Sequence, residues 1–170
     1  GLQWLLAHGA DPNVPSYAGR ANQPQAGETP LHRAAAVGHG VEVLRALVEH
    51  GARVNLRRDD GVSAYQLAVR VGNIEGAAYL ASVGAETTLT SVDELLGACA
   101  RVDGEMARAI VASHPGILGS LGTSERDALG LAQHLLGRLR AGWAASGLWT
   151  AEAIAEQDAY YGNLSATWSF

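Results

Sequence analysis

Apolar residues in the first part of the chain recur at the three- and four-residue spacing of amphipathic helices. Val41, Leu44, Leu47 and Val48 form one such stripe, which stops at Gly51. This spacing places all four side chains on one face of a helix, so that face must be buried against another element. The pattern predicts a helix that begins near Val41 and ends just before the glycine.

A shorter helix is predicted directly before this one. Thr29 can cap its N-terminus through the side-chain hydroxyl, which contributes about 1 kcal/mol relative to alanine. Pro30 then occupies the first helical position, where its missing N–H is not needed. Gly38 can adopt the left-handed conformation that ends a helix. Together the two predicted helices form one unit of helix, turn and helix.

This unit recurs along the chain. The sequence Gly-Ala-Arg-Val-Asn at 51–55 has counterparts at 9–13 and 84–86. Gly51 and Gly84 are 33 residues apart, and Gly38 and Gly72 are 34 residues apart. One unit of this size cannot bury its own apolar stripe, whereas stacked units form a continuous core. The repetition therefore predicts an all-α solenoid of helix-turn-helix repeats with short, hairpin-like connecting loops.

Later units carry similar start signals. Ser63 is a predicted cap with Gln66 three residues on, the segment 91–94 reads as a capping box, and a further helix is expected from Ser124. The outer helix of the third unit is expected to end at Pro115 and to present the apolar residues Met106, Ala109, Ile110 and Val111.

The segment 27–35, which reads GETPLHRAA, together with Gly38-His39 and Gly51-Ala52, resembles the ankyrin repeat signature. Ala64, Gln66 and Asn73 depart from that pattern, in places where it has proline and two histidines. Looser helix starts are therefore expected in the later units. The resemblance gives an array over 1–132, comprising a partial first repeat 1–13, an insertion loop 14–26, clear repeats 27–60 and 61–86, and degenerate repeats 87–132.

Residues 133–170 do not follow the repeat pattern. Six aromatic residues gather in this atypical C-terminal segment, namely Trp143, Trp149, Tyr160, Tyr161, Trp168 and Phe170. Three interpretations remain open from the sequence. The segment is a cap over the end of the stack, a docking segment for a partner or a membrane surface, or a poorly ordered tail unrelated to the repeats.

The residues with reactive side chains favour structural roles. His8 and His50 occupy the same place in successive units and so lie one repeat apart instead of converging, and His32 and His39 are expected to bond main-chain groups near helix ends. Cys99, the only cysteine, lies among small apolar residues without a neighbouring base. The glycine string at 116–122 lacks the context of a phosphate loop and reads as a flexible connector. We predict no catalytic residue, metal site or cofactor.

Composition narrows the classes of partner. The 170-residue chain has a net charge of −5, with twelve arginines and no basic block, which argues against nucleic-acid binding. No apolar stretch reaches the length of a membrane span, so a membrane partner is not expected. The expected protein is a cytoplasmic monomer that binds another protein.

The resemblance also implies where that partner binds. In ankyrin-type arrays the freely varying surface positions lie on the loop tips and inner helices, which form a concave surface. The corresponding residues here are Gln25, Glu28, Arg33, Ala36, Val37, Arg57, Asp59, Asp60, Val62, Arg70 and Val71.

Two other functions remain open at this stage. The repeats could be the regulatory or substrate-selecting arm of a longer enzyme or toxin, with its catalytic part upstream of Gly1. They could also be a purely structural spacer, which charge reversal at Arg57, Arg58 and Arg70 is expected to distinguish from a binding surface.

Overall fold

The computed structural model describes residues 1–16, 27–122, 125, 126 and 129 of the chain. Within these residues it contains eight helices, which are α1 (Leu2–Ala7), α2 (Pro30–Ala36), α3 (Val41–Glu49), α4 (Ala64–Arg70), α5 (Ile74–Ser82), α6 (Ser91–Ala100), α7 (Gly104–Ser113) and α8 (Ile117–Ser120). The described part has no strand. One antiparallel bridge joins Arg57 to Ser63 and closes the loop between α3 and α4 into a hairpin.

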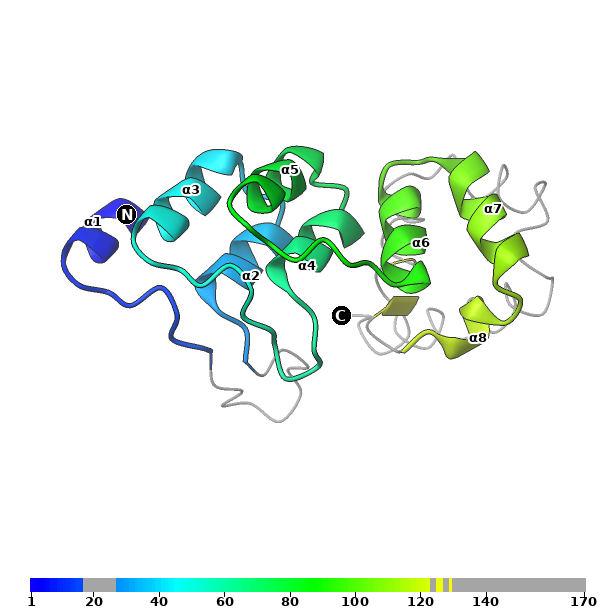
Figure 1. The fold of residues 1–170 in the computed structure, drawn as a ribbon, viewed down its shortest axis with the longest axis horizontal. Coiled ribbons are helices and arrows are strands. Elements are labelled where there is room, and N and C mark those ends of the chain that lie inside the picture. Colours follow the sequence, from blue (N-terminus) through cyan, green and yellow to red (C-terminus); the bar gives the residue numbers. More distant parts are fainter. Residues whose placement is uncertain (17–26, 123–124, 127–128, 130–170) are drawn as a thin grey trace, which may run out of the picture. The chain divides into compact units, whose positions relative to one another are not determined.

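The helices pack as successive pairs. Helix α2 packs against α3, α4 against α5, and α6 against α7, while α4 also contacts α2 on one side and α6 on the other. Figure 1 shows α3 and α5 in one row and α2 and α4 in a second row. We call α2, α4 and α6 the inner helices and α3, α5 and α7 the outer helices. This arrangement confirms the predicted all-α repeat solenoid.

Local signals start and end the helices where the sequence predicts. Thr29 is the N-cap of α2 and Pro30 is its first residue. Gly38 and Gly72 have φ angles of +71° and +72° after the two inner helices α2 and α4. Val102 occupies the equivalent place after α6 and has a φ of 62°. This conformation is unfavourable for a β-branched residue, so the third unit ends its inner helix under strain.

The cap of α6 lies one residue earlier than predicted. Thr90, not Ser91, is the N-cap, and its hydroxyl accepts a hydrogen bond from the Asp93 backbone N–H at 3.2 Å. Asp93 completes the capping box by accepting from the Thr90 backbone N–H at 2.7 Å. Adjacent threonine and serine residues both suit a cap, and the position of the buried Asp93 selects between them.

The third unit differs from expectation in two further respects. Met106 is 47% exposed and Ala109 is also exposed, so the predicted stripe of α7 is wrong at both positions, and Ala107 and Ile110 are buried instead. The glycine string predicted as a flexible connector contains the short helix α8. Helix α8 begins after Gly116, whose φ is +93°, and buries Ile117.

Most buried apolar residues of the core are leucines and alanines. Leu44, Leu47 and Leu80 of the outer helices are at most 1% exposed. Several fully buried alanines lie on the inner helices, including Ala35, Ala64, Ala68 and Ala98. Small side chains allow neighbouring inner helices to approach closely, whereas leucine fills the wider space between the two rows.

Contacts divide the chain after Leu129. Most of the helix predicted from Ser124 lies outside the described residues, as do residues 17–26 of the predicted insertion loop and the whole of the predicted tail at 133–170.

Candidate functional site

The predicted interaction residues divide into three groups in the structure. The exposed members are Arg33, Val37, Arg57, Asp59, Asp60 and Val71. Ala36 and Arg70 are half-buried, Glu28 and Val62 are buried, and Gln25 lies outside the described residues.

The prediction that Glu28 and Val62 face solvent is wrong. They are 7% and 8% exposed, and each directly precedes the cap of an inner helix. The Arg58 backbone N–H donates to the Val62 carbonyl at 3.0 Å, which folds the loop back, and the Val62 side chain joins the core. The residue before the cap is therefore directed inward by the loop.

Arg70 belongs to an internal ion pair. Its Nε donates to Asp93 Oδ1 at 2.6 Å, and its side chain is 17% exposed while that of Asp93 is fully buried. A second ion pair joins Arg70 to Glu125 at 3.5 Å. Burial alone would raise the pKa of Asp93, but hydrogen bonds from Thr90 and Arg70 outweigh it and lower the pKa. Arg70 thus joins α4 to α6, and we remove it from the binding surface.

The two arginines of the hairpin loop differ in accessibility. Arg57 donates to Glu86 Oε2 at 2.6 Å and to the Gly61 carbonyl at 2.8 Å, with a side chain 44% exposed. Arg58 pairs with Asp60 and its side chain is only 9% exposed. Charge reversal at Arg58 would therefore disturb the fold as well as any binding surface.

His32 has a structural role, as its sequence position predicts. Its ring is 1% exposed, with Nδ1 bonded to Thr29 Oγ1 at 2.8 Å and Nε2 bonded to the Leu56 carbonyl of the next loop at 3.0 Å. Burial lowers the pKa of His32, and hydrogen bonding to Leu56 only partly opposes this effect. The neutral imidazole thus closes the start of α2 and joins it to the following unit.

Gln66 takes the place of His32 one repeat later. Its Oε1 accepts from the Ser63 backbone N–H at 2.9 Å, and its Nε2 donates to Asp93 Oδ2 at 2.9 Å. The third residue of each inner helix therefore caps its own helix, and in α2 and α4 it also bonds to the next unit. The looser helix start expected at α4 is not found, because the capping box with Ser63 is complete.

Three histidines close helix C-termini. His8, His50 and His114 each bond through Nδ1 to the carbonyl four residues earlier, at 2.7, 2.8 and 3.2 Å. His39 differs from the prediction. It is exposed, and its main-chain carbonyl rather than its ring takes part in a hydrogen bond of the described structure, accepting from Asn73 Nδ2 at 3.2 Å.

Asparagines join successive units at their loops, a role that the sequence analysis missed. Asn13 donates to the Gly51 carbonyl at 2.9 Å and accepts from the Arg53 backbone N–H at 2.7 Å. Asn55 makes the corresponding pair of bonds with Gly84 and Glu86, at 3.0 and 2.8 Å. The recurrence of asparagine four residues after Gly9 and after Gly51 was the available signal.

Cys99 is a buried core residue. It is 1% exposed, and burial raises the pKa of its thiol to about 12. A thiol with such a pKa is protonated at neutral pH, so it lacks the thiolate that a nucleophile requires.

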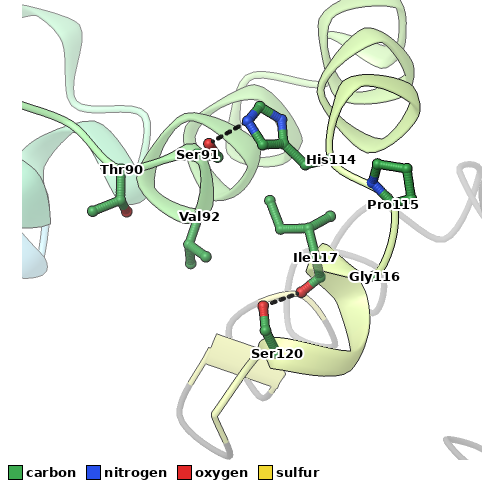
Figure 2. A pocket seen from close by; sticks show the side chains of 8 residues that line it. All are labelled: Thr90, Ser91, Val92, His114, Pro115, Gly116, Ile117 and Ser120. Carbon is green, nitrogen blue, oxygen red and sulfur yellow. Dashed lines mark hydrogen bonds between the residues drawn. The ribbon is translucent and has the colours of Figure 1, made fainter.

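A pocket of about 470 Å³ lies beside the start of α6 and the segment between α7 and α8. Figure 2 shows its lining residues, which are Thr90, Ser91, Val92, His114, Pro115, Gly116, Ile117 and Ser120. The Ser91 Oγ is bonded to His114 Nε2 at 2.9 Å. The other ring nitrogen of His114 bonds the Ile110 carbonyl in the last turn of α7. In a catalytic nucleophile–base pair, a carboxylate would instead bond this nitrogen and orient the imidazole. We interpret Ser91–His114 as a contact that ties α7 to α6.

Three further aspartates lie in a helix cap and in a turn. Asp103 caps α7 by accepting from the Met106 backbone N–H at 3.0 Å, and Asp59 and Asp60 are exposed in the hairpin loop. Across the residues that the structure describes, no three His, Cys, Asp or Glu side chains come close enough to hold a metal ion.

Three exposed residues of the predicted strip lie on or directly after neighbouring inner helices, without a side-chain hydrogen bond or ion pair in the described structure. Arg33 lies in α2, Val37 follows α2, and Val71 follows α4 at the place equivalent to Val37. The two valines are 53% and 41% exposed. We call Arg33, Val37 and Val71 the inner-helix surface.

Comparison with known proteins agrees with this architecture. The family model for ankyrin repeats in three copies matches residues 1–91. The human "SH3 and multiple ankyrin repeat domains protein 2" is 37% identical over 81 residues, which are 48% of this chain and 4% of that protein. The bovine "Ankyrin repeat domain-containing protein 37" is 36% identical over 93 residues, 55% of this chain and 53% of that protein.

These alignments span about half the length of the shorter relative and a small fraction of the longer one. No helix in the described part of the chain is long and apolar enough to cross a membrane. The repeated helix pairs, the GETPLHRAA segment and the match over residues 1–91 lead to one conclusion: the chain belongs to the ankyrin repeat family.

Proposed function

We propose that this chain is a non-catalytic module that binds a partner protein through its inner helices and loop tips. The observation that carries the proposal is the contrast between polar side chains that hydrogen-bond within the repeat stack and side chains that are exposed to solvent. His32, Gln66, Arg70 and Asp93 are engaged in bonds within and between repeats, while the inner-helix surface presents two valines and an arginine to solvent. Exposed apolar groups beside arginine are typical of protein interfaces.

Affinity capture with the chain, followed by mass spectrometry, identifies the partner. The double substitution Val37→Ser and Val71→Ser is expected to reduce capture of that partner without unfolding the protein. Val83→Ser is the matched control, because Val83 is 36% exposed at the end of the outer helix α5. Equal capture by both variants would contradict a binding surface on the inner helices.

Arg57 provides a second test, since its side chain is accessible and its ion pair with Glu86 is exposed. Arg57→Glu is expected to weaken partner binding with little change in stability, because exposed ion pairs contribute about 0 to 1 kcal/mol. Unchanged binding by this variant and by the double valine variant would favour the spacer interpretation.

As part of the same proposal, we expect the protein to be cytoplasmic and monomeric. The alternative, a regulatory or substrate-selecting arm of a longer enzyme or toxin, is tested by the full open reading frame. A set of catalytic motifs upstream of Gly1 would support that alternative.

A further inference from the structure

Exposed apolar side chains gather at the turns between inner and outer helices. Five of them lie there in three successive units and are between 41% and 63% exposed, namely Val37, Val71, Ile74, Val102 and Met106. We call these five residues the turn row. Its two first members also belong to the inner-helix surface, while Ile74 and Met106 lie in the first turns of the outer helices α5 and α7. Contiguous exposed apolar groups mark interaction sites.

The turns that carry this row touch one another. Asn73 Nδ2 donates to the His39 carbonyl at 3.2 Å, which joins the turn after α4 to the turn after α2. A Cβ placed on Gly72 would lie 3.3 Å from Ala100 Cβ, so the turn after α4 also reaches the end of α6. The five apolar residues are therefore distributed along one continuous edge of the stack, at the C-terminal ends of the inner helices.

Glutamates accompany the row on its outer-helix side. Glu42, Glu75 and Glu105 are each the second residue of an outer helix, and all three are exposed. Glu75 directly follows Ile74, and Glu105 directly precedes Met106. None of the three glutamates forms an ion pair with another residue that the structure describes.

Three nearby arginines are engaged elsewhere. Arg45 of α3 lies over the Tyr79 ring, 5.9 Å from its centroid. The Arg108 Nε donates at 2.9 Å to the first carbonyl of its own helix α7. Arg101 Nη1 lies 3.2 Å from the point where a Cβ on Gly97 would be, so this guanidinium is directed back along α6. The edge therefore combines apolar groups with negative charge on one side.

This combination restricts the class of partner. Glutamates repel anionic lipids and nucleic acids. A protein segment with apolar side chains beside lysine or arginine complements both features, and the net charge of −5 favours its approach. Neighbouring helices pack about 8 to 10 Å apart, and seven residues of helix span about 10 Å. A helix laid along the row would thus meet one unit every seven residues.

We propose that the turn row binds an amphipathic helix of the partner protein, whose apolar stripe is bordered on one side by lysine or arginine. The stripe packs on the five apolar residues, and the basic side chains face the three glutamates. This inference rests on the proposed function and specifies the chemistry of the partner. Val102 fits it, because its strained backbone presents an apolar side chain where Gly38 and Gly72 have none.

The test uses the full 170-residue chain and a fluorescein-labelled helical peptide as probe. The peptide has leucine at positions a and d of three heptads, lysine at position e, and alanine or glutamine elsewhere. Two control peptides replace the lysines by glutamate or the leucines by serine. The lysine peptide is expected to bind saturably and at least about tenfold more tightly than either control. Absence of saturable binding, or equal binding of the three peptides, would overturn the proposal.

Variants assign binding to the apolar residues. The double substitution Ile74→Ser and Met106→Ser is expected to weaken the lysine peptide at least about tenfold, because two apolar contacts are lost. Val83→Ser, at the other end of α5 from Ile74, is the control and is expected to leave the affinity unchanged. Equal affinities of the double variant and the control would contradict docking on the turn row.

The charged side of the row is tested separately. Glu42→Gln, Glu75→Gln and Glu105→Gln together are expected to weaken the lysine peptide about tenfold. Glu49→Gln, an exposed acid at the last position of α3, is expected to have no effect. In 1 M NaCl the affinities of the triple variant and the wild type should converge, because salt screens exposed charges. A salt-independent affinity would argue against the basic border.

Val102→Gly distinguishes loss of binding from loss of stability. Glycine relieves the backbone strain and raises the urea midpoint, but it removes an apolar contact. The variant is therefore expected to bind the lysine peptide about threefold more weakly although it is more stable. Unchanged affinity would remove Val102 from the site.

Other occupants of the row would give different results, each of which overturns the proposal. A dimer in sedimentation that Ile74→Ser with Met106→Ser dissociates would assign the row to a second copy of the chain. Tighter binding to phosphatidylcholine–phosphatidylserine vesicles than to the peptide would assign it to a membrane. Loss of partner capture in the double valine variant, without any effect of Ile74→Ser with Met106→Ser, would leave the proposed function intact and reject the turn row alone.

Discussion

Single residues in this chain are best understood by comparing equivalent places in successive repeats. Val102 follows α6 where glycine follows α2 and α4, and it is held at a φ of 62°. Its side chain is 45% exposed, so little packing compensates for the backbone strain. Val102 therefore destabilises the third unit at a place where the two preceding units have glycine.

Val102→Gly is expected to stabilise the protein by about 1 kcal/mol, because glycine adopts the left-handed conformation without the Cβ clash. Urea unfolding measures the change. Val71→Gly is the matched control, since Val71 is similarly exposed but has a φ of −95°. That variant is expected to lose stability, and a gain for both would contradict the role assigned to backbone strain.

His32 makes stability depend on pH. The folded state lowers the pKa of His32, so the unfolded chain, with a pKa of about 6.5, binds protons more readily. The stabilisation is therefore complete above about pH 6.5 and declines as the pH falls toward the lower pKa of the folded state.

His32→Gln is expected to reduce this decline in unfolding free energy between about pH 7.5 and 5.5. Glutamine is the natural replacement, because Gln66 makes the equivalent bonds in the next repeat. His39→Gln, at an exposed turn, is expected to retain the wild-type decline. The interpretation fails if the two variants have the same pH dependence.

At the scale of elements, polar side chains join one inner helix to the next. The bonds of Gln66 and Arg70 to the fully buried Asp93 connect α4 to α6. Burial of the Asp93 carboxylate carries a large desolvation penalty, which these hydrogen-bond donors offset. The third unit is thus attached by a charged contact in addition to its leucines.

Arg70→Met is expected to destabilise the protein by about 3 kcal/mol, because it leaves Asp93 buried without its cation. Adding Asp93→Asn should recover part of the loss, since a neutral amide does not require a counter-charge. Arg33→Met, at an exposed site on α2, is expected to cost less than about 0.5 kcal/mol. Equal costs for the two arginine variants would refute the internal role of Arg70.

The sequence predicts the helices well because their signals are local. Cap residues such as Thr29 and Ser63 and the stripe of α3 act within a few positions of the chain. The interaction residues are less predictable, because their accessibility depends on tertiary contacts. Arg70 has the sequence context of a surface cation, and only the fold brings Asp93, 23 residues later, beside it.

At the scale of the molecule, the leucine four residues before the glycine that ends a unit is buried only where a complete helix pair surrounds it. Leu47 and Leu80 are 1% and 0% exposed, and both lie four residues before the glycine that ends the repeat. Leu5 lies four residues before Gly9 in the partial first unit and is 52% exposed. The same register thus gives buried and exposed leucines, depending on the packing around them.

The most direct test of the repeat stack compares Leu47→Ala with Leu5→Ala in urea unfolding. The account predicts a loss of about 2 to 5 kcal/mol for Leu47→Ala, because a cavity forms between the two rows of helices. It predicts a loss below about 1 kcal/mol for Leu5→Ala, because that side chain is already half exposed. Similar losses at the two positions would contradict the packing of helix pairs on which the proposed binding surface depends.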